Sequence, residues 1–371
     1  MLPGAREAWI DATEKFIGNP SSPHRIGQRA DRVLQEAREE LATILGCDAG
    51  DIVWTSGATE SANAVFHHWE RTLPADAEVW LSAIEHPCVL AAAEARFPGR
   101  VVLLPVTPDG VVDVGRFTEV LRHKAPGAVA VMAANNETGV IQPWREIREL
   151  CSAARIPFFC DAVQWVGKLS SRGLAACDFV SGSAHKFGGP RGVGFLKCPS
   201  GVKLSPMISG GGQEDGRRAG TENVAGVLSM ISALREREVT IAAGGAVERE
   251  SWRREFESHL IAELPGSEIV GAKVPRLWNT VSALMPEADC QQRWVVKLDR
   301  FGFAVSTGSA CSSGREKASH VLSAMGYAPA AAGRVLRFSS GWETKREDWL
   351  ALLDGLKQVS EVVGRAASVA K

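Results

Sequence analysis

The sequence predicts an α/β fold with a mainly parallel sheet flanked by helices, followed by a smaller α+β domain. Over the first two thirds of the 371 residues, short apolar runs alternate with amphipathic stretches, which is typical of strand and helix repeats in a parallel sheet. Beyond a long helical segment the pattern changes to separate strands with helices between them. At roughly 100–200 residues per domain, the length also suggests two domains or one large domain with an appendage.

Apolar patterning predicts two helices and seven strands in the large domain before its last helical segment. The first predicted helix runs from Gln28 to Gly46, because apolar residues recur at helical spacing and Gly46 marks the stop. A second helix is predicted from Thr59 to Trp69. The predicted sheet has seven strands, at residues 51–55, 78–82, 101–106, 128–134, 156–160, 178–182 and 193–196.

A long helical segment is predicted from about Thr221 to Leu264, with a break near Gly244 and Gly245. Past it, candidate strands lie at residues 279–284, 303–307 and 334–340. We therefore expect a large domain over residues 18–264 and a small α+β domain formed by residues 1–17 and 265–371.

Charge and cysteine content argue against several classes of function. The chain has 42 Lys and Arg against 43 Asp and Glu, so it lacks the positive excess of nucleic-acid or anionic-membrane binders. None of the eight cysteines forms a C-x-x-C pair, so no metal site is expected. The opening residues MLPGAREAWIDATEKF lack a signal-peptide run, which predicts a cytoplasmic protein with reduced thiols.

The segment TSGATES, residues 55–61, follows a predicted strand and opens a helix. Gly57 and Ala58 in this turn, with the Thr59 hydroxyl, can surround an anion such as phosphate, because backbone N–H groups point outward there. A simple helix cap is the alternative reading.

Two further polar segments, ANNETG at 134–139 and CDAVQWVGK at 160–168, also follow apolar strands. Asp161 can hold a protonated ring nitrogen while Gln164 reaches a neighbouring ring oxygen. A loop-bracing Asp is the alternative.

Lys186 lies in SGSAHKFGGPRGVGFL, just after a predicted strand, with Ser183 and His185 before it. A lysine there can form a Schiff base with a carbonyl cofactor, and the alternative is an ordinary surface lysine. The glycines of GGPRGVG precede a strand, whereas a dinucleotide-binding loop opens a helix.

Taken together, these segments resemble the cysteine desulfurase family, the NifS/IscS-like group I, within the class V aminotransferase superfamily of pyridoxal-phosphate (PLP) enzymes of fold type I. Six motifs appear in family order over nearly the whole chain: TSGATESAN, NNETGVIQP, DAVQWVGK, SAHKFGGPRGVGFL, GGGQEDGRRAGTEN and VSTGSACSSG. The Arg-x-Gly-His-His-Cys context of the other family group is absent.

The resemblance implies a role for each cofactor residue. Lys186 would bind PLP covalently and move protons, Asp161 would pair with the ring nitrogen, and His86 would stack on the ring and serve in acid–base steps. Gln164 would contact the ring hydroxyl. The phosphate would lie among Gly57, Ala58, Thr59, Ser183, His185 and, from the partner subunit of a homodimer, Thr221.

The resemblance also implies the substrate and the reaction. Asn136 and Arg337 would hold the carboxylate of L-cysteine. The thiolate of Cys311 would attack the substrate sulfur, giving L-alanine and a Cys311 persulfide. That sulfur would serve Fe–S cluster assembly or thiolation through an acceptor or scaffold protein.

The sequence departs from the family pattern in three places. The family usually opens with a strand of the type Tyr-Leu-Asp-x-x-Ala-Thr-Thr, whereas this sequence begins at MLPGAREAW, and relatives often carry Arg where Trp342 lies. The sequence also stops at Lys371 without the tail that some relatives use to engage a scaffold. Three alternatives stay open: an aminotransferase, a selenocysteine lyase, and a catalytically weak sulfur-relay protein that lacks the first strand.

Overall fold

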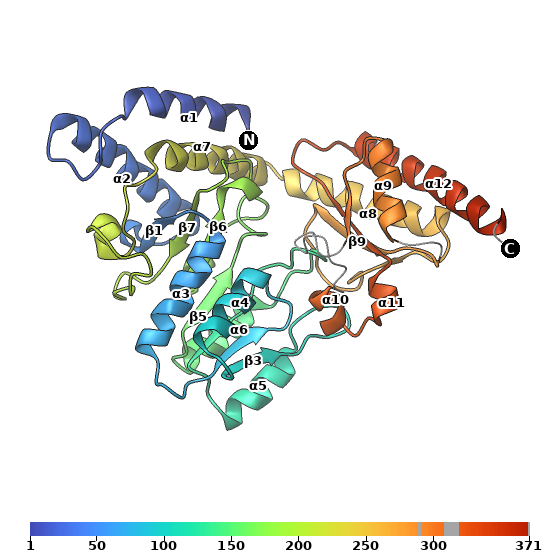
Figure 1. Cartoon of the computed structure of the whole chain (residues 1–371), viewed down its shortest axis with the longest axis horizontal. Helices are drawn as coiled ribbons and strands as arrows, with labels where there is room; N and C mark the ends of the chain where they lie inside the picture. Colours follow the sequence, from blue (N-terminus) through green and yellow to red (C-terminus); the bar gives the residue numbers. More distant parts are fainter. Residues whose placement is uncertain (288–290, 308–318, 370–371) are drawn as a thin grey trace. The chain divides into compact units, whose positions relative to one another are not determined.

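The computed structural model describes residues 1–287, 291–307 and 319–369. The chain divides into two compact units (Figure 1). Unit 1 comprises residues 1–104, 114–133 and 143–243, and unit 2 comprises residues 105–113, 134–142 and 244–371.

Unit 1 is built on a seven-stranded sheet in the order β1-β7-β6-β5-β4-β2-β3. Only β7 runs against its neighbours, since it pairs antiparallel with β1 and β6 while the other pairs are parallel. The prediction of a mainly parallel sheet is therefore confirmed. The strands are β1 (Ile52–Thr55), β2 (Val79–Ser82), β3 (Val101–Leu104), β4 (Ala128–Ala130), β5 (Phe158–Asp161), β6 (Phe179–Ser183) and β7 (Gly194–Lys197).

Most strands of this sheet are buried along their whole length, as expected of a parallel sheet that helices cover. Phe66 on helix α3 lies at the centre of an aromatic cluster and meets Trp69, Phe97 and Phe159 edge to face. The helices are α1 (Pro3–Lys15), α2 (Arg25–Leu45), α3 (Ala58–Thr72), α4 (Pro87–Arg96), α5 (Val114–His123), α6 (Trp144–Ala153) and α7 (Val224–Ala242). Short 3₁₀ turns are η1 (Ala49–Asp51), η2 (Leu174–Ala176), η3 (Ala184–Lys186) and η4 (Gln213–Gly216).

Unit 2 contains an antiparallel four-stranded sheet in the order β10-β11-β9-β8. Its core joins Phe256 to Phe338 and Trp349 through aromatic contacts, and helices pack with its antiparallel strands. The strands are β8 (Glu268–Ile269), β9 (Thr280–Leu284), β10 (Ser306–Thr307) and β11 (Val335–Ser339). The helices are α8 (Gly245–Glu263), α9 (Gln291–Arg300), α10 (His320–Ala324), α11 (Pro329–Ala332) and α12 (Arg346–Val369).

The unit boundaries differ from the expected domain limits. The long helical segment breaks where predicted, at Gly244 with φ of +80°, but unit 1 ends there rather than at residue 264. Residues 1–17 belong to unit 1 and not to the small domain, because α1 packs along α7. The Ser229 hydroxyl donates to the carbonyl of Ala5 at 2.6 Å, and the Leu2 amide donates to the carbonyl of Gly188 at 2.8 Å.

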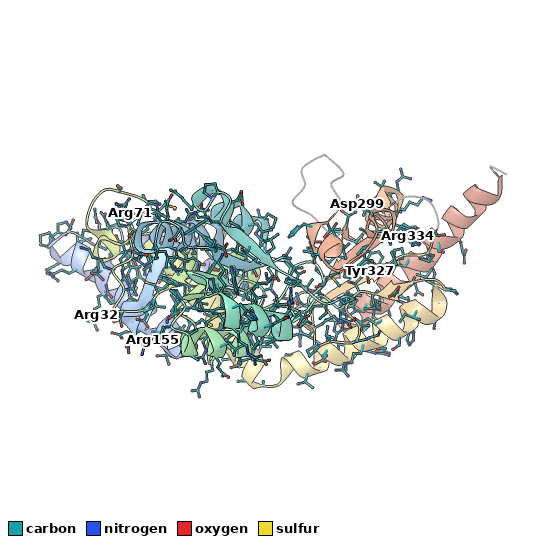
Figure 2. The ribbon with its side chains drawn as sticks, turned by 90° about the horizontal axis from the view of Figure 1, so that it is seen from below. Arg32, Arg71, Arg155, Asp299, Tyr327 and Arg334 are labelled. Atoms are coloured by element: carbon teal, nitrogen blue, oxygen red, sulfur yellow. The ribbon has the colours of Figure 1, made fainter. Side chains whose placement is uncertain are left out.

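Positive charge on unit 1 is spread over separate elements. Arg32 on α2, Arg71 on α3 and Arg155 after α6 are all exposed (Figure 2). Within the described ranges, no helix combines the length and apolar character needed to cross a bilayer.

Candidate active site

Polar residues gather where the parallel strands of unit 1 end. Strand β5 ends at Asp161, β6 ends at Ser183 before Lys186, and β2 ends at Ser82 shortly before His86. Because the carboxyl ends of parallel strands meet at one edge of a sheet, these residues share that edge. A positive charge on Lys186, or on His86 when its ring is protonated, lowers the pKa of the Asp161 carboxyl, as expected of close neighbours.

The turn before α3 forms a cradle of small residues. The Ala58 amide donates to the Ser183 hydroxyl at 2.9 Å, so the start of α3 is tied to the end of β6. Gly57 has φ of +148°, and a Cβ there would lie 3.3 Å from the Ser183 oxygen. The predicted strand, turn and helix are present, and a helix N-terminus lined by hydroxyls suits a phosphate.

Asp161 is buried, and its Oδ1 accepts hydrogen bonds from the Val163 amide at 3.0 Å and the Ser181 hydroxyl at 3.1 Å. Burial raises the pKa of this carboxyl, while the Val163 bond, the charge that His86 carries when protonated, and the charge of Lys186 oppose the rise. Oδ1 of Asp161 therefore braces the loop, as the alternative interpretation of this residue predicts. A buried carboxyl of this kind favours a cationic group close by.

His86 is the N-cap residue of helix α4. Its Nδ1 accepts from the Cys88 amide at 3.2 Å and lies 3.0 Å from the Cys88 sulfur. Because Nδ1 is the acceptor, we assign the proton of the neutral ring to Nε2. The Cys88 thiol also hydrogen-bonds with Thr59, and burial raises its pKa to about 12.

Several cations surround Lys186 at the end of β6. Burial lowers the pKa of His185, and the charges of Lys186, Arg191 and Lys168 lower it further. The close approach of the segment after β5 supports this cluster, since a Cβ on Gly167, whose φ is +71°, would collide with the Cβ of Phe187. A concentration of positive charge beside the α3 turn favours an anionic ligand.

Lys168 is a member of this cluster that the sequence did not single out. Its side chain is only 5% exposed, and Nζ donates to the Gln164 amide oxygen at 2.7 Å and to the Gln164 carbonyl at 3.1 Å. Lys168 follows Gln164 by four residues, a spacing that places two side chains side by side on a helical turn. The spacing does not indicate that the lysine is buried.

Asn136 and Arg337 come together in unit 2. The Arg337 guanidinium on β11 donates from Nη1 to the Asn136 carbonyl at 2.9 Å. Glu137, missed by the sequence reasoning, is buried beside them and accepts a 2.5 Å hydrogen bond from the Ser319 hydroxyl. Burial raises the pKa of Glu137, while the Ser319 bond and the charges of His320 and Arg337 oppose the rise.

Thr221 and Cys311 complete the set of predicted site residues. Thr221 is exposed in the segment before α7, where its predicted role concerns a partner subunit. Cys311 lies outside the described residues. The roles assigned to all the predicted site residues stay predictions.

The sheet, the lysine after β6 and the buried aspartate after β5 are features of PLP-dependent enzymes of fold type I. The chain belongs to the aminotransferase class-V family, whose model matches residues 6–352. Enzymes of this family use PLP in general. The predicted family resemblance is therefore confirmed.

Similar proteins cover nearly the whole chain. A cysteine desulfurase of Klebsiella pneumoniae is 36% identical over 93% of this chain and 86% of its own length. A NifS-like protein from Rickettsia africae has a TM-score of 0.87 at 29% identity, over 97% of this chain and 96% of that one. A structure of SspA in complex with cysteine has a TM-score of 0.77 at 26% identity, over 91% of this chain and 95% of that one.

Proposed function

We propose that this chain is a PLP-dependent cysteine desulfurase that converts L-cysteine to L-alanine and leaves the sulfur as a persulfide on Cys311. One observation carries the proposal: Lys186, Asp161, His86 and the α3 turn share one edge of the sheet. Membership of the class-V family supports it, as does similarity to a protein named cysteine desulfurase.

The residues at the sheet edge fit PLP in chemistry. The α3 turn with Ser183 and His185 suits the phosphate, since a helix N-terminus and the Ser183 hydroxyl meet there and positive charge is nearby. The buried Asp161, whose pKa burial raises, suits a cationic ring nitrogen. When bound, PLP supplies an electron-withdrawing ring that stabilises negative charge at the substrate α-carbon.

Each residue then has one task. Lys186 takes and returns the proton at the α-carbon, and His86 presents Nε2–H beside the ring. Arg337 holds the substrate carboxylate through a charged pair, with Asn136 beside it.

The sulfur transfer needs no external oxidant. The Cys311 thiolate attacks the sulfur of cysteine, an S–S bond forms, and the substrate Cβ–S bond breaks with its electron pair left on carbon. A proton on that carbon completes L-alanine, and Cys311 holds the sulfur until an acceptor takes it. The proposal includes a homodimer in which Thr221 of each chain contacts the phosphate of PLP in the neighbouring chain. It also places the enzyme in the cytoplasm, with a sulfur-acceptor or scaffold protein as its partner.

The test supplies purified protein with PLP, L-cysteine and a reductant, and measures sulfide and alanine. We expect the two products in equal amounts, and their loss in Cys311→Ala. Cys47→Ala is the matched control, because burial raises the pKa of the Cys47 thiol to about 11 and keeps it protonated at neutral pH.

Other outcomes contradict the proposal in distinct ways. Undiminished sulfide from Cys311→Ala would reject the nucleophile. Conversion of PLP to its amine form without sulfide would indicate an aminotransferase, and selenide release that survives loss of Cys311 would indicate a selenocysteine lyase. Binding of PLP without turnover would favour the sulfur-relay alternative.

A further inference from the structure

The side chain of Lys168 is buried against the amide of Gln164. Lys168 Nζ lies 2.7 Å from Oε1 and 3.1 Å from the backbone oxygen of the same residue. Its side chain is 5% exposed, so water does not compete for these bonds. One lysine therefore holds both carbonyl oxygens of Gln164.

The turn after β5 places the two side chains on one face. The amides of Trp165 and Val166 both donate to the carbonyl of Ala162, so the chain winds helically from Ala162. Residues four apart on such a turn are neighbours, which brings Lys168 under Gln164. The close approach of Gly167 to Phe187 holds this turn against the segment that carries Lys186.

The contact fixes which end of the Gln164 amide faces away from Lys168. An ammonium group has three donors and no acceptor, so the atom it meets is the amide oxygen rather than the NH₂ group. A neutral amine has two N–H donors, enough for the two oxygens that Lys168 contacts, together with one lone pair, so the orientation is fixed most firmly by the ammonium form. The Gln164 NH₂ group is therefore left to donate elsewhere.

We propose, building on the proposed function, that Lys168 is a positioning residue that orients the Gln164 amide so that its NH₂ group donates to the ring oxygen of PLP. A misoriented amide would present its oxygen to that ring oxygen, and two acceptors repel each other. Lys168 thereby stabilises the deprotonated ring oxygen through Gln164 without touching PLP.

Charges near Lys168 matter for any measurement against pH. Burial, and then the charge of Lys186, lower the pKa of Lys168 to about 7. His185 lies in the same cluster, since the charge of Lys168 lowers its pKa. A change at Lys168 can therefore act through charge as well as through Gln164, and the test separates the two.

The test follows the visible absorption of bound PLP against pH, together with PLP affinity. In Lys168→Met we expect the absorption midpoint to rise by about one pH unit, the size of a hydrogen bond to a charged group. Lys168→Arg keeps the donors and is expected to show no rise of the midpoint. Lys168→Leu is the second apolar variant, should Lys168→Met not fold.

Two comparisons separate positioning from charge and from folding. In a Gln164→Ala background, Lys168→Met should move the midpoint no further, and the same one-unit shift there would overturn the inference. Lys197→Met is the matched control, because Lys197 is also 5% exposed and donates to backbone carbonyls of Cys177 and Ala175. We expect Lys197→Met to keep the wild-type midpoint, and an equal shift there would contradict the proposal.

The outcomes also separate this inference from the proposed function. A wild-type chain that does not bind PLP would overturn both. A wild-type chain that binds PLP, with an unchanged midpoint in Lys168→Met, would overturn the role of Lys168 alone.

Discussion

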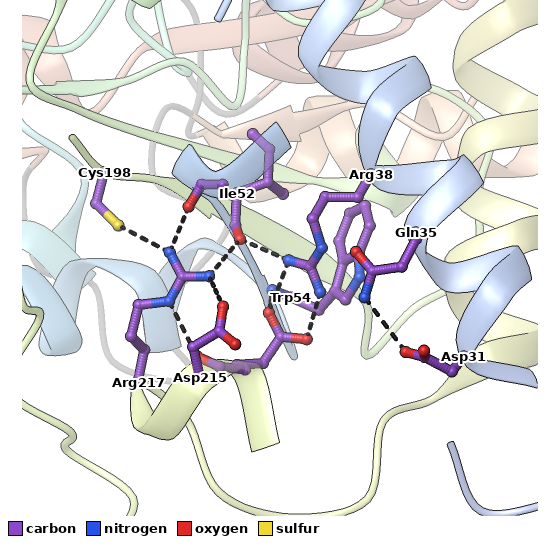
Figure 3. Close-up of polar contacts among 10 residues, drawn as sticks. Asp31, Gln35, Arg38, Ile52, Trp54, Cys198, Asp215 and Arg217 are labelled. Atoms are coloured by element: carbon purple, nitrogen blue, oxygen red, sulfur yellow. Dashed lines mark hydrogen bonds and ion pairs between the residues drawn. The ribbon is translucent and has the colours of Figure 1, made fainter. Parts of the chain in front are cut away.

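Arg38 and Glu214 form a buried two-pronged ion pair in unit 1 (Figure 3). Nη1 and Nη2 of Arg38 each lie 2.9 Å from a Glu214 oxygen, and the Trp54 amide donates to the same carboxylate at 3.0 Å. Glu214 and Asp215 have φ of +50° and +57°, an unfavourable conformation for residues with side chains. The ion pair thus holds the strained turn η4 against β1.

Breaking this pair should cost much of the stability of the chain. Glu214→Gln removes the partner charge and leaves the Arg38 guanidinium buried, so we expect the unfolding free energy to fall by about 3 kcal/mol. Urea denaturation measures the change. Glu40→Gln is the control, because its ion pair with Arg235 is exposed and should contribute less than about 1 kcal/mol. Equal losses in the two variants would contradict the prediction.

Gly167 is expected to tolerate no side chain. Gly167→Ala adds both an unfavourable φ and a collision with Phe187, which would push the Lys168 turn away from Lys186. We expect lower thermal stability and weaker PLP binding, measured by absorbance titration. Gly46→Ala separates the two causes, because Gly46 has φ of +82° with nothing within 4 Å. PLP binding as tight in Gly167→Ala as in Gly46→Ala would argue against the collision.

Lys168 should make stability depend on pH. Its folded pKa is lowered from 10.5 to about 7, so between these values the unfolded chain binds more protons at this residue than the folded chain. The unfolding free energy of the PLP-free protein should therefore rise with pH in this window, by at most about 1.4 kcal/mol per unit from this group. Denaturation at pH 7.5 and 9.5 should give a smaller increase in Lys168→Met than in wild type. The same increase in both proteins would show that this lysine titrates normally.

Contacts within unit 2 explain why a tryptophan occupies position 342, where relatives often carry Arg. Its ring lies 4.3 Å from Trp278 and 5.0 Å from the guanidinium of Arg249, which also donates to the Trp342 carbonyl at 3.1 Å. Trp342→Arg places a second cation against Arg249, so we expect a loss of about 3 kcal/mol or more. Trp342→Phe keeps an aromatic face and should lose less. Calorimetry that finds Trp342→Arg as stable as wild type would remove the explanation.

Much of the fold and part of the site were predictable from the sequence because they depend on local pattern. Apolar runs ending in Asp161 and before Lys186 predict both the strands and the edge they share. The place of α1 was not predictable, since it depends on packing against α7 more than 200 residues later. Glu137 was missed for the same reason, because its partner Ser319 is 182 positions away and only folding brings them together.

The hydrogen bond from the Cys88 amide to His86 links ring chemistry to backbone structure. A proton added to the neutral ring must go to Nδ1, which then no longer accepts from that amide. Charging His86 thus costs the first turn of α4 its cap, a penalty of about 1 kcal/mol. In the proposed acid–base role of His86, each protonation of the ring would therefore open this cap at the start of α4, and each deprotonation would re-form it.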